Sequence, residues 1–150
     1  MADLPGAVLF ACTLNAFRSP MAEGLMKRLH GARVYVDSCG VRPEPEADID
    51  PFVAQVMNEI GIDMGGFRPK SFAEVAGDSF DLIITLSPEA HHHALELTRT
   101  QAVDVRYWPT QDPSAFTGSR EQILTAYRMV RDTLRRRIEQ TFGTGGTPAV

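Results

Sequence analysis

The stretch from Cys12 to Ser19, which reads Cys-Thr-Leu-Asn-Ala-Phe-Arg-Ser, contains the residues best suited to chemistry. A thiol is a strong nucleophile only as a thiolate, and the positive end of a helix or a nearby guanidinium stabilises that anion. Arg18 carries a permanent charge and can clamp an oxyanion through two parallel hydrogen bonds. The spacing therefore predicts a loop in which Cys12 attacks a tetrahedral oxyanion, such as a phosphoryl group, that Arg18 holds.

The backbone of this loop is expected to bind the same anion. Successive amide N–H groups in a curled loop before a helix form an anion-binding nest, which stabilises charge in the transition state. Asn15 tolerates the left-handed backbone that such a curl needs. Ser19 is placed to cap the next helix and to donate a hydrogen bond to the thiolate. The predicted phosphate-binding residues are Thr13, Leu14, Asn15, Ala16, Phe17 and Arg18.

A simpler interpretation of Cys12 exists, because a cysteine at the end of a buried strand is often just a small core residue. The surrounding sequence favours the active loop, since the apolar run 7–11 reads as a buried strand and Pro20 begins a helical pattern. The chain continues in alternation, and strands separated by helices predict a parallel sheet with helices on both faces. We expect strands at 7–11, 33–37, 81–86 and 103–108, and helices at 20–30, 51–60, 71–76, 88–97 and 120–141.

Parallel sheets bind ligands at the carboxyl ends of their strands. Cys12, Ser38 and Asp112 are all expected at those ends. Serine or aspartate before proline predicts a helix start at Ser19-Pro20, Asp50-Pro51 and Ser87-Pro88. Ser119 and Gln122 fit a capping box for the last helix.

Asp112 is a candidate general acid, because a covalent step on Cys12 needs a proton for the leaving group. It lies in a loop stiffened by Pro113, although an Asp-Pro pair can also simply start a turn. The run His91-His92-His93 does not predict a metal site, since consecutive helical residues point about 100° apart. We therefore expect no metal and no cofactor.

Composition narrows the class of protein. The 150 residues suit one domain, 1–150, with a small-residue tail at 143–150 that we expect to be disordered. A net charge of −4 argues against nucleic-acid binding, and no apolar run reaches the roughly 20 residues of a membrane helix. Two cysteines make no disulfide framework, and the N-terminus has no signal-peptide pattern, so we expect a cytoplasmic protein. Because the apolar faces of the helices are used by the core, we expect a monomer.

The run from Val8 to Glu23 resembles the opening of the low-molecular-weight protein tyrosine phosphatase superfamily, which includes thiol-coupled arsenate reductases. The resemblance continues at Asp37-Ser38, at 61–64, at 81–84 and at Asp112-Pro113, and so spans nearly the whole chain. It implies a flavodoxin-like three-layer α/β sandwich with a four-stranded parallel sheet of order 2-1-3-4.

The resemblance also implies roles for individual residues. Cys12 would be the nucleophile and Arg18 the phosphate clamp, with Ser19 as thiolate partner and Asp112 as general acid. Asn15 and Ser38 would hold the loop in shape. Oxyanions such as phosphate, sulfate or arsenate would bind in the loop.

The sequence departs from the family pattern at four places. Leu14 stands where the loop usually has glycine, and Phe17 stands where many members have a second cysteine. Ser114-Ala115 replaces the aromatic pair that usually lines a phosphotyrosine slot after Asp-Pro. The loop 41–46 lacks the usual aromatic residue, so Phe17 or Phe116 would have to supply a wall.

These features predict hydrolysis of a phosphomonoester, either protein phosphotyrosine or a small aryl phosphate, through a cysteinyl-phosphate. Two alternatives stay open: an arsenate reductase that borrows an external thiol, and a non-catalytic anion-binding regulatory module. An internal cysteine relay of the multi-cysteine kind is not expected, because residues 86–90 contain no cysteine. We also consider a reversible Cys12–Cys39 disulfide, against the simpler interpretation of Cys39 as a buried thiol.

Overall fold

The computed structural model describes residues 4–44 and 46–145. Strands and helices alternate along the chain as the sequence predicts, with boundaries that shift by a few residues. The strands are β1 (Ala7–Cys12), β2 (Tyr35–Gly40), β3 (Leu82–Thr85) and β4 (Asp104–Tyr107). The helices are α1 (Arg18–His30), α2 (Pro51–Asn58), α3 (Phe72–Val75), α4 (Pro88–Leu97), the 3-10 turn η1 (Pro113–Ala115) and α5 (Arg120–Phe142).

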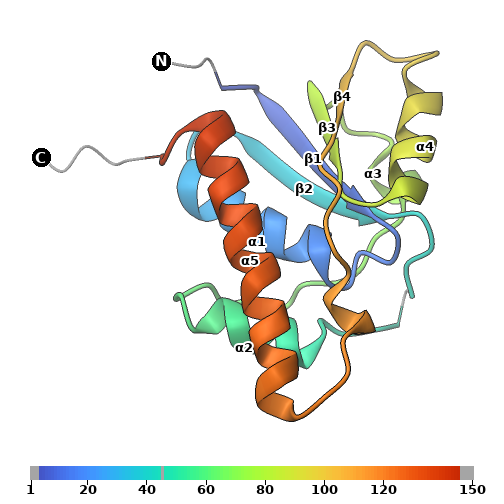
Figure 1. The fold of residues 1–150 in the computed structure, drawn as a ribbon. Coiled ribbons are helices and arrows are strands. Elements are labelled where there is room, and N and C mark those ends of the chain that lie inside the picture. Colours follow the sequence, from blue (N-terminus) through green and yellow to red (C-terminus); the bar gives the residue numbers. More distant parts are fainter. Residues whose placement is uncertain (1–3, 45, 146–150) are drawn as a thin grey trace, which may run out of the picture.

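The described strands form one parallel sheet with the order β2-β1-β3-β4, which confirms the predicted order (Figure 1). The strand β1 lies inside the sheet and is buried along its whole length, which explains its uninterrupted apolar sequence. All four strands run the same way, so Cys12 and the loops that follow the other strands meet at one edge.

Helices cover both faces of the sheet (Figure 1). The helices α1, α2 and α5 pack on one face, and α3 and α4 pack on the other. Side chains of β1 alternate between the two cores: Val8, Phe10 and Cys12 join the α1–α5 side, and Leu9 and Ala11 join the α3–α4 side. Cys12 therefore points toward α1 and away from α4.

Two predicted boundaries are wrong, and both concern the candidate site. The strand β2 continues to Gly40, so Ser38 lies within the strand and not at its end. The helix α1 begins at Arg18, with Phe17 at the N-cap position and no side-chain cap. Ser19 is thus inside the first turn and does not cap the helix, which leaves its hydroxyl group available for Cys12.

The other predicted helix starts are confirmed. Asp50 accepts hydrogen bonds from the amides of Phe52 and Val53, and Ser87 accepts one from Ala90. Ser119 and Gln122 form the expected capping box of α5. Along α5 the buried positions include Tyr127, Val130, Leu134 and Ile138, as the apolar spacing predicts.

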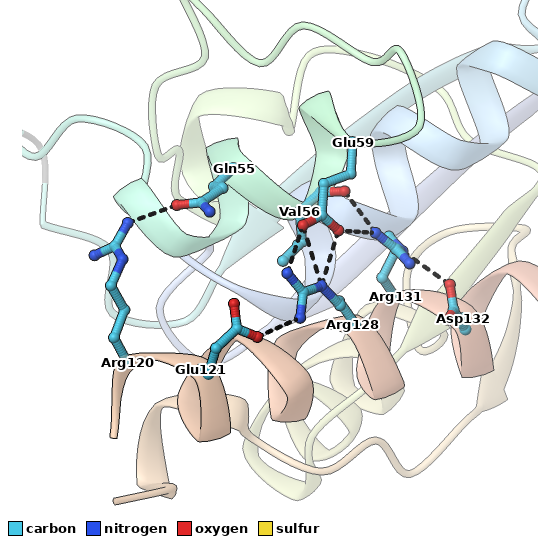
Figure 2. A network of polar contacts seen from close by, with 8 residues as sticks. All are labelled: Gln55, Val56, Glu59, Arg120, Glu121, Arg128, Arg131 and Asp132. Carbon is cyan, nitrogen blue, oxygen red and sulfur yellow. Dashed lines mark hydrogen bonds and ion pairs between the residues drawn. The ribbon is translucent and has the colours of Figure 1, made fainter. Parts of the chain in front are cut away.

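A polar network joins α2 to α5 at the surface of this face (Figure 2). Glu59, the C-cap residue of α2, forms ion pairs with Arg128 at 2.7 Å and with Arg131 at 2.9 Å. Arg131 also donates to the carbonyl oxygen of Val56 at 2.7 Å. The network fixes α2, and hence the loop before it, against the longest helix of the chain.

Among residues 4–44 and 46–145, no helix combines the length and hydropathy of a membrane span. Most of the tail predicted to be disordered, residues 146–150, lies outside the described residues.

Candidate active site

Cys12 ends β1 and is 2% exposed. Its Sγ lies 2.9 Å from the hydroxyl oxygen of Ser19, which is itself fully buried. A hydroxyl at this distance can donate to a thiolate and stabilise its charge. The structure thus brings Cys12 and Ser19 together as the resemblance implies.

Asn15 holds the curl of the loop. It is the only non-glycine residue with positive φ, at 54°, among the described residues, so it takes the left-handed position predicted for it. Its side-chain nitrogen donates to Ser19 Oγ at 2.8 Å and to Ser38 Oγ at 3.0 Å. Its side-chain oxygen accepts the amide N–H of Lys70 at 2.8 Å. Leu14 needs no left-handed conformation, which explains how the loop forms without glycine there.

Gly40, at the end of β2, lets the loop pass close to the neighbouring strand. A Cβ atom at this position would lie 2.7 Å from the amide nitrogen of Asn15 and 2.9 Å from the carbonyl oxygen of Thr13. Next to it, the amide of Arg42 donates to the Thr13 carbonyl at 2.8 Å. The role of Gly40 is not predicted from the sequence, because only the register of β2 on β1 shows what the glycine faces.

The loop is also tied to α4. The Thr13 hydroxyl donates to Ser87 Oγ at 3.0 Å, and Ser87 in turn caps α4. The sequence predicts the capping role of Ser87 but gives no sign of this contact, which joins residues 74 positions apart. Thr13 is therefore fixed by a side chain as well as by its backbone.

Arg18 is 9% exposed and approaches the loop from the first turn of α1. It donates through Nη1 to the carbonyl oxygen of Thr110 at 3.1 Å. Its Nε is buried and has no hydrogen-bond partner among the described residues. A buried guanidinium N–H without a partner is costly, and an oxyanion in the loop would satisfy it.

Asp112 lies beside Arg18, with its Oδ2 3.9 Å from Arg18 Nη2. The other oxygen, Oδ1, accepts hydrogen bonds from the amide and the hydroxyl of Ser114 at 2.9 and 2.6 Å. One oxygen is therefore fixed by η1, while the other is available next to the clamp. The turn-forming role and the acid role proposed for Asp112 are compatible in this arrangement.

The amide N–H groups of residues 13–17 have no acceptor within the described residues. Together with Arg18 they leave a run of donors without acceptors in the loop that follows Cys12, as expected of an anion nest. Among the described residues no group of three or more His, Cys, Asp and Glu side chains is placed to hold a metal ion. The arrangement can bind a tetrahedral oxyanion and present it to a thiolate.

Leu14, Ala16 and Phe17 line a pocket of about 350 Å³ together with the loop before α2. Phe17 packs edge-on against Tyr127, with ring centroids 6.3 Å apart. Asp50 also lines this pocket, and burial raises the pKa of its carboxyl group above the ordinary value. Phe116 is 48% exposed and Ser114 and Ala115 are small, so the loop after β4 offers little aromatic wall.

The two cysteines lie on opposite faces of the sheet. In the parallel register Ala11 is aligned with Cys39 and Cys12 with Gly40, so the Cys39 side chain enters the α3–α4 core. This contradicts the hypothesis of a Cys12–Cys39 disulfide, since both thiols are free and their side chains diverge. Burial raises the pKa of the Cys39 thiol, which makes it a poor nucleophile.

The sequence matches the model of a known protein family, in agreement with the fold and the loop. Residues 7–144 match the model of the low molecular weight phosphotyrosine protein phosphatases. The chain belongs to this family. The predicted superfamily is thus confirmed, and its cysteine-dependent enzymes are phosphatases or arsenate reductases.

Curated relatives within the superfamily bear arsenate reductase names. The chain is 31% identical over 139 residues to an arsenate reductase of Halalkalibacterium halodurans, covering 92% of this chain and 96% of the relative. It is 29% identical over 132 residues to a glutaredoxin arsenate reductase of Synechocystis sp., covering 88% of this chain and 92% of the relative.

Solved structures of the same family share the fold. An arsenate reductase in a phosphate-binding state has 28% identity and a TM-score of 0.68, over 89% of this chain and 94% of the other. A low molecular weight protein tyrosine phosphatase from T. tengcongensis has a TM-score of 0.76 at 24% identity, over 89% and 95% of the two chains, which supports the fold alone.

Proposed function

We propose that the chain reduces arsenate to arsenite with electrons from an external thiol. The observation that carries this proposal is the buried Arg18 Nε without a partner beside the Cys12 loop, with no aromatic pair after Asp112-Pro113. A small inorganic oxyanion needs the loop and no aromatic slot. The names of the curated relatives support the same assignment.

In the first step the Cys12 thiolate attacks arsenic and displaces one oxygen. Asp112 supplies the proton, so this oxygen leaves as water and an S–As(V) adduct forms. The loop amides and Arg18 hold the remaining oxygens and stabilise the negative charge that develops on them. Ser19 donates its hydrogen bond to Cys12 Sγ before attack.

In the second step a thiolate of the donor attacks Cys12 Sγ. The S–As bond breaks with its electron pair on arsenic, which leaves as arsenite, and a mixed disulfide forms between donor and Cys12. A second donor thiolate then attacks the donor sulfur and releases the Cys12 thiolate. One arsenate and two thiols thus give one arsenite, one disulfide and one water.

The chain contains two cysteines, and Cys39 faces the other core of the sheet. Both reducing thiols of the second step must therefore come from a donor molecule. This requirement separates the proposed reaction from one that relays oxidation through several cysteines of the same chain.

Arsenate-dependent oxidation of a glutathione–glutaredoxin system and of a thioredoxin system tests the proposal, with arsenite measured directly. We expect arsenite with at least one donor, none with Cys12→Ser, and full activity with Cys39→Ser. Turnover that requires Cys39 would contradict the use of an external donor. If neither donor system gave arsenite, the reductase assignment would be contradicted.

Phosphomonoester hydrolysis is the second candidate, favoured by Asp112 Oδ2, which lies beside Arg18 while Oδ1 is held by Ser114. In that reaction Asp112 protonates an ester oxygen and water later attacks the cysteinyl-phosphate. Phosphotyrosine peptide and p-nitrophenyl phosphate should be assayed beside arsenate, with EDTA expected to change none of the rates. Phosphate binding without turnover of any substrate would instead indicate an anion-binding regulatory module.

A further inference from the structure

A chain of side-chain contacts runs from the nucleophile into the body of α1. It passes from Cys12 to Ser19, Asn15 and Ser38, and ends at Glu23. We infer that Glu23 is a positioning residue that fixes the direction of these hydrogen bonds, so that the Ser19 hydroxyl donates to Cys12. The inference rests on the proposed role of Cys12 as nucleophile.

The direction of the hydrogen bonds is set first at the side chain of Asn15. The Lys70 amide can only donate, and it lies 2.8 Å from the side-chain oxygen of Asn15. The NH₂ group of Asn15 must therefore face the two serines and donate to both. Each serine oxygen thus accepts from Asn15, and each serine proton has to find an acceptor elsewhere.

Glu23 provides that acceptor for Ser38. The Ser38 hydroxyl donates to Glu23 Oε1 at 2.5 Å, while Lys27 Nζ donates to Glu23 Oε2 at 2.7 Å. Glu23 is 7% exposed and Ser38 is fully buried, so water does not readily replace the contact between them. The two carboxylate oxygens have separate donors, and Ser38 is held with a lone pair toward Asn15.

The same logic determines Ser19. Its oxygen accepts from Asn15, which leaves its proton for Cys12 Sγ at 2.9 Å; the carbonyl oxygen of Cys39 is farther away, at 3.5 Å. Through Ser38 and Asn15, Glu23 thereby supports the hydrogen bond that Ser19 donates to the Cys12 thiolate. It touches neither the oxyanion site nor Cys12.

Replacement of Glu23 by Gln brings donors into conflict. If the new amide keeps its oxygen toward Ser38, its NH₂ group faces the Lys27 ammonium group. If the amide flips, its NH₂ group and that of Asn15 both donate to Ser38 Oγ, and the Ser38 proton loses its acceptor. Lys27→Met removes the first conflict, because no ammonium group then lies against the NH₂ group of the glutamine and Ser38 can donate as before.

The test is the pH dependence of Cys12 alkylation by iodoacetamide, followed by peptide mass spectrometry without any substrate. Glu23→Gln should raise the pH midpoint by about one unit, which slows alkylation about tenfold at pH values below the midpoint of the unmodified protein. Lys27→Met should stay close to the unmodified protein, and Glu23→Gln with Lys27→Met should restore the midpoint. Glu59→Gln, the same change on α2, serves as the matched control and should leave the midpoint unchanged.

A simple charge effect predicts the opposite sign, because removal of a carboxylate favours a thiolate. A lower midpoint in Glu23→Gln, or no rescue in the double variant, would overturn the inference. Loss of folding in both Glu23→Gln and the double variant would make Glu23 a stability residue and would also overturn it, whereas folding restored by Lys27→Met supports the donor conflict. Alkylation needs no turnover, so failure of the proposed reaction would leave this readout intact.

Discussion

At the scale of single residues, the side chains proposed as nucleophile, clamp and proton donor have distinct surroundings. Cys12, at the end of β1, and Arg18, in the first turn of α1, are buried, whereas the Asp112 side chain is 37% exposed. In the proposed reaction, binding and attack depend on Cys12 and Arg18, and protonation of the leaving oxygen depends on Asp112. Substitutions should separate these contributions.

Asp112→Asn should lower kcat for arsenate reduction about a hundredfold, because an amide cannot protonate the departing oxygen. Affinity for phosphate, used as a non-reacting oxyanion, should change little. Steady-state kinetics and calorimetric titration measure the two effects. Asp104→Asn, at an exposed position of β4, is the control. If Asp112→Asn weakened phosphate binding as much as it lowered kcat, Asp112 would have a structural role.

Arg18→Lys should weaken phosphate binding at least about tenfold, since a lysine ammonium group cannot replace a planar fork that also contacts the Thr110 carbonyl. Calorimetric titration with phosphate gives the affinity directly. Arg106→Lys, on β4, keeps the net charge and should bind as the unmodified protein does. If Arg18→Lys bound phosphate with unchanged affinity, Arg18 would not be the residue that clamps the oxyanion.

At the scale of elements, the loop takes its shape from its neighbours on both sides. The end of β2 presents Gly40 to the loop, α4 presents Ser87 to Thr13, and the segment before α3 presents the Lys70 amide to Asn15. The loop is thus held at three points that lie far apart in sequence. Disturbing one of them should damage catalysis without touching any reacting atom.

Gly40→Ala tests this directly, because its methyl group would overlap the backbone of Thr13, Leu14 and Asn15. We expect kcat/KM to fall about a hundredfold, since a loop displaced by about 1 Å no longer aligns the oxyanion with Cys12. Gly77→Ala is the matched control, because a Cβ there meets nothing within 4 Å. Equal activity of the two variants would show that the loop does not need this close approach.

At the scale of the whole molecule, the face that carries the site is held together by α5. Tyr127 of α5 packs against Phe17 of the loop and against Phe52 of α2. Further along, Arg128 and Arg131 bind Glu59 on the other end of α2 (Figure 2). The position of α2 relative to the loop therefore depends on a network outside the site.

The ion pairs with Arg128 and Arg131 lower the pKa of Glu59 below its ordinary value. A lowered folded-state pKa adds stability above the unfolded-state pKa, and this stability is lost as pH falls through the folded-state value. Glu59→Gln should therefore lower the melting temperature at pH 7 by about 2 to 5 °C, and the difference should shrink toward acid pH.

Thermal unfolding between pH 7 and pH 3 measures this difference. Glu121→Gln removes a more exposed partner of Arg128 and should have a smaller effect at every pH. A difference between Glu59→Gln and the unmodified protein that stayed constant with pH would show that ionisation of Glu59 is not the cause.

The sequence by itself determined the order of elements, because hydrophobic spacing and Asp-Pro or Ser-Pro caps are local signals. It also determined the chemistry of the loop, since a thiol and a guanidinium six positions apart converge once a strand, a turn and a helix are in place. The parallel sheet follows from alternation, whereas the 2-1-3-4 order was reached through resemblance. Boundaries at Ser19 and Ser38 were predicted incorrectly because local propensity does not include the hydrogen bonds that the loop makes.

Only the tertiary structure decided what surrounds Cys12. The register of β2 on β1 sends Cys39 into the opposite core and sets Gly40 against the loop, and a shift of one residue would reverse both. The contacts of Thr13 with Ser87 and of Asn15 with Lys70 join positions more than fifty residues apart, so no local pattern could reveal them. The sequence carries the candidate reacting groups, and long-range packing determines their geometry and keeps Cys39 apart from Cys12.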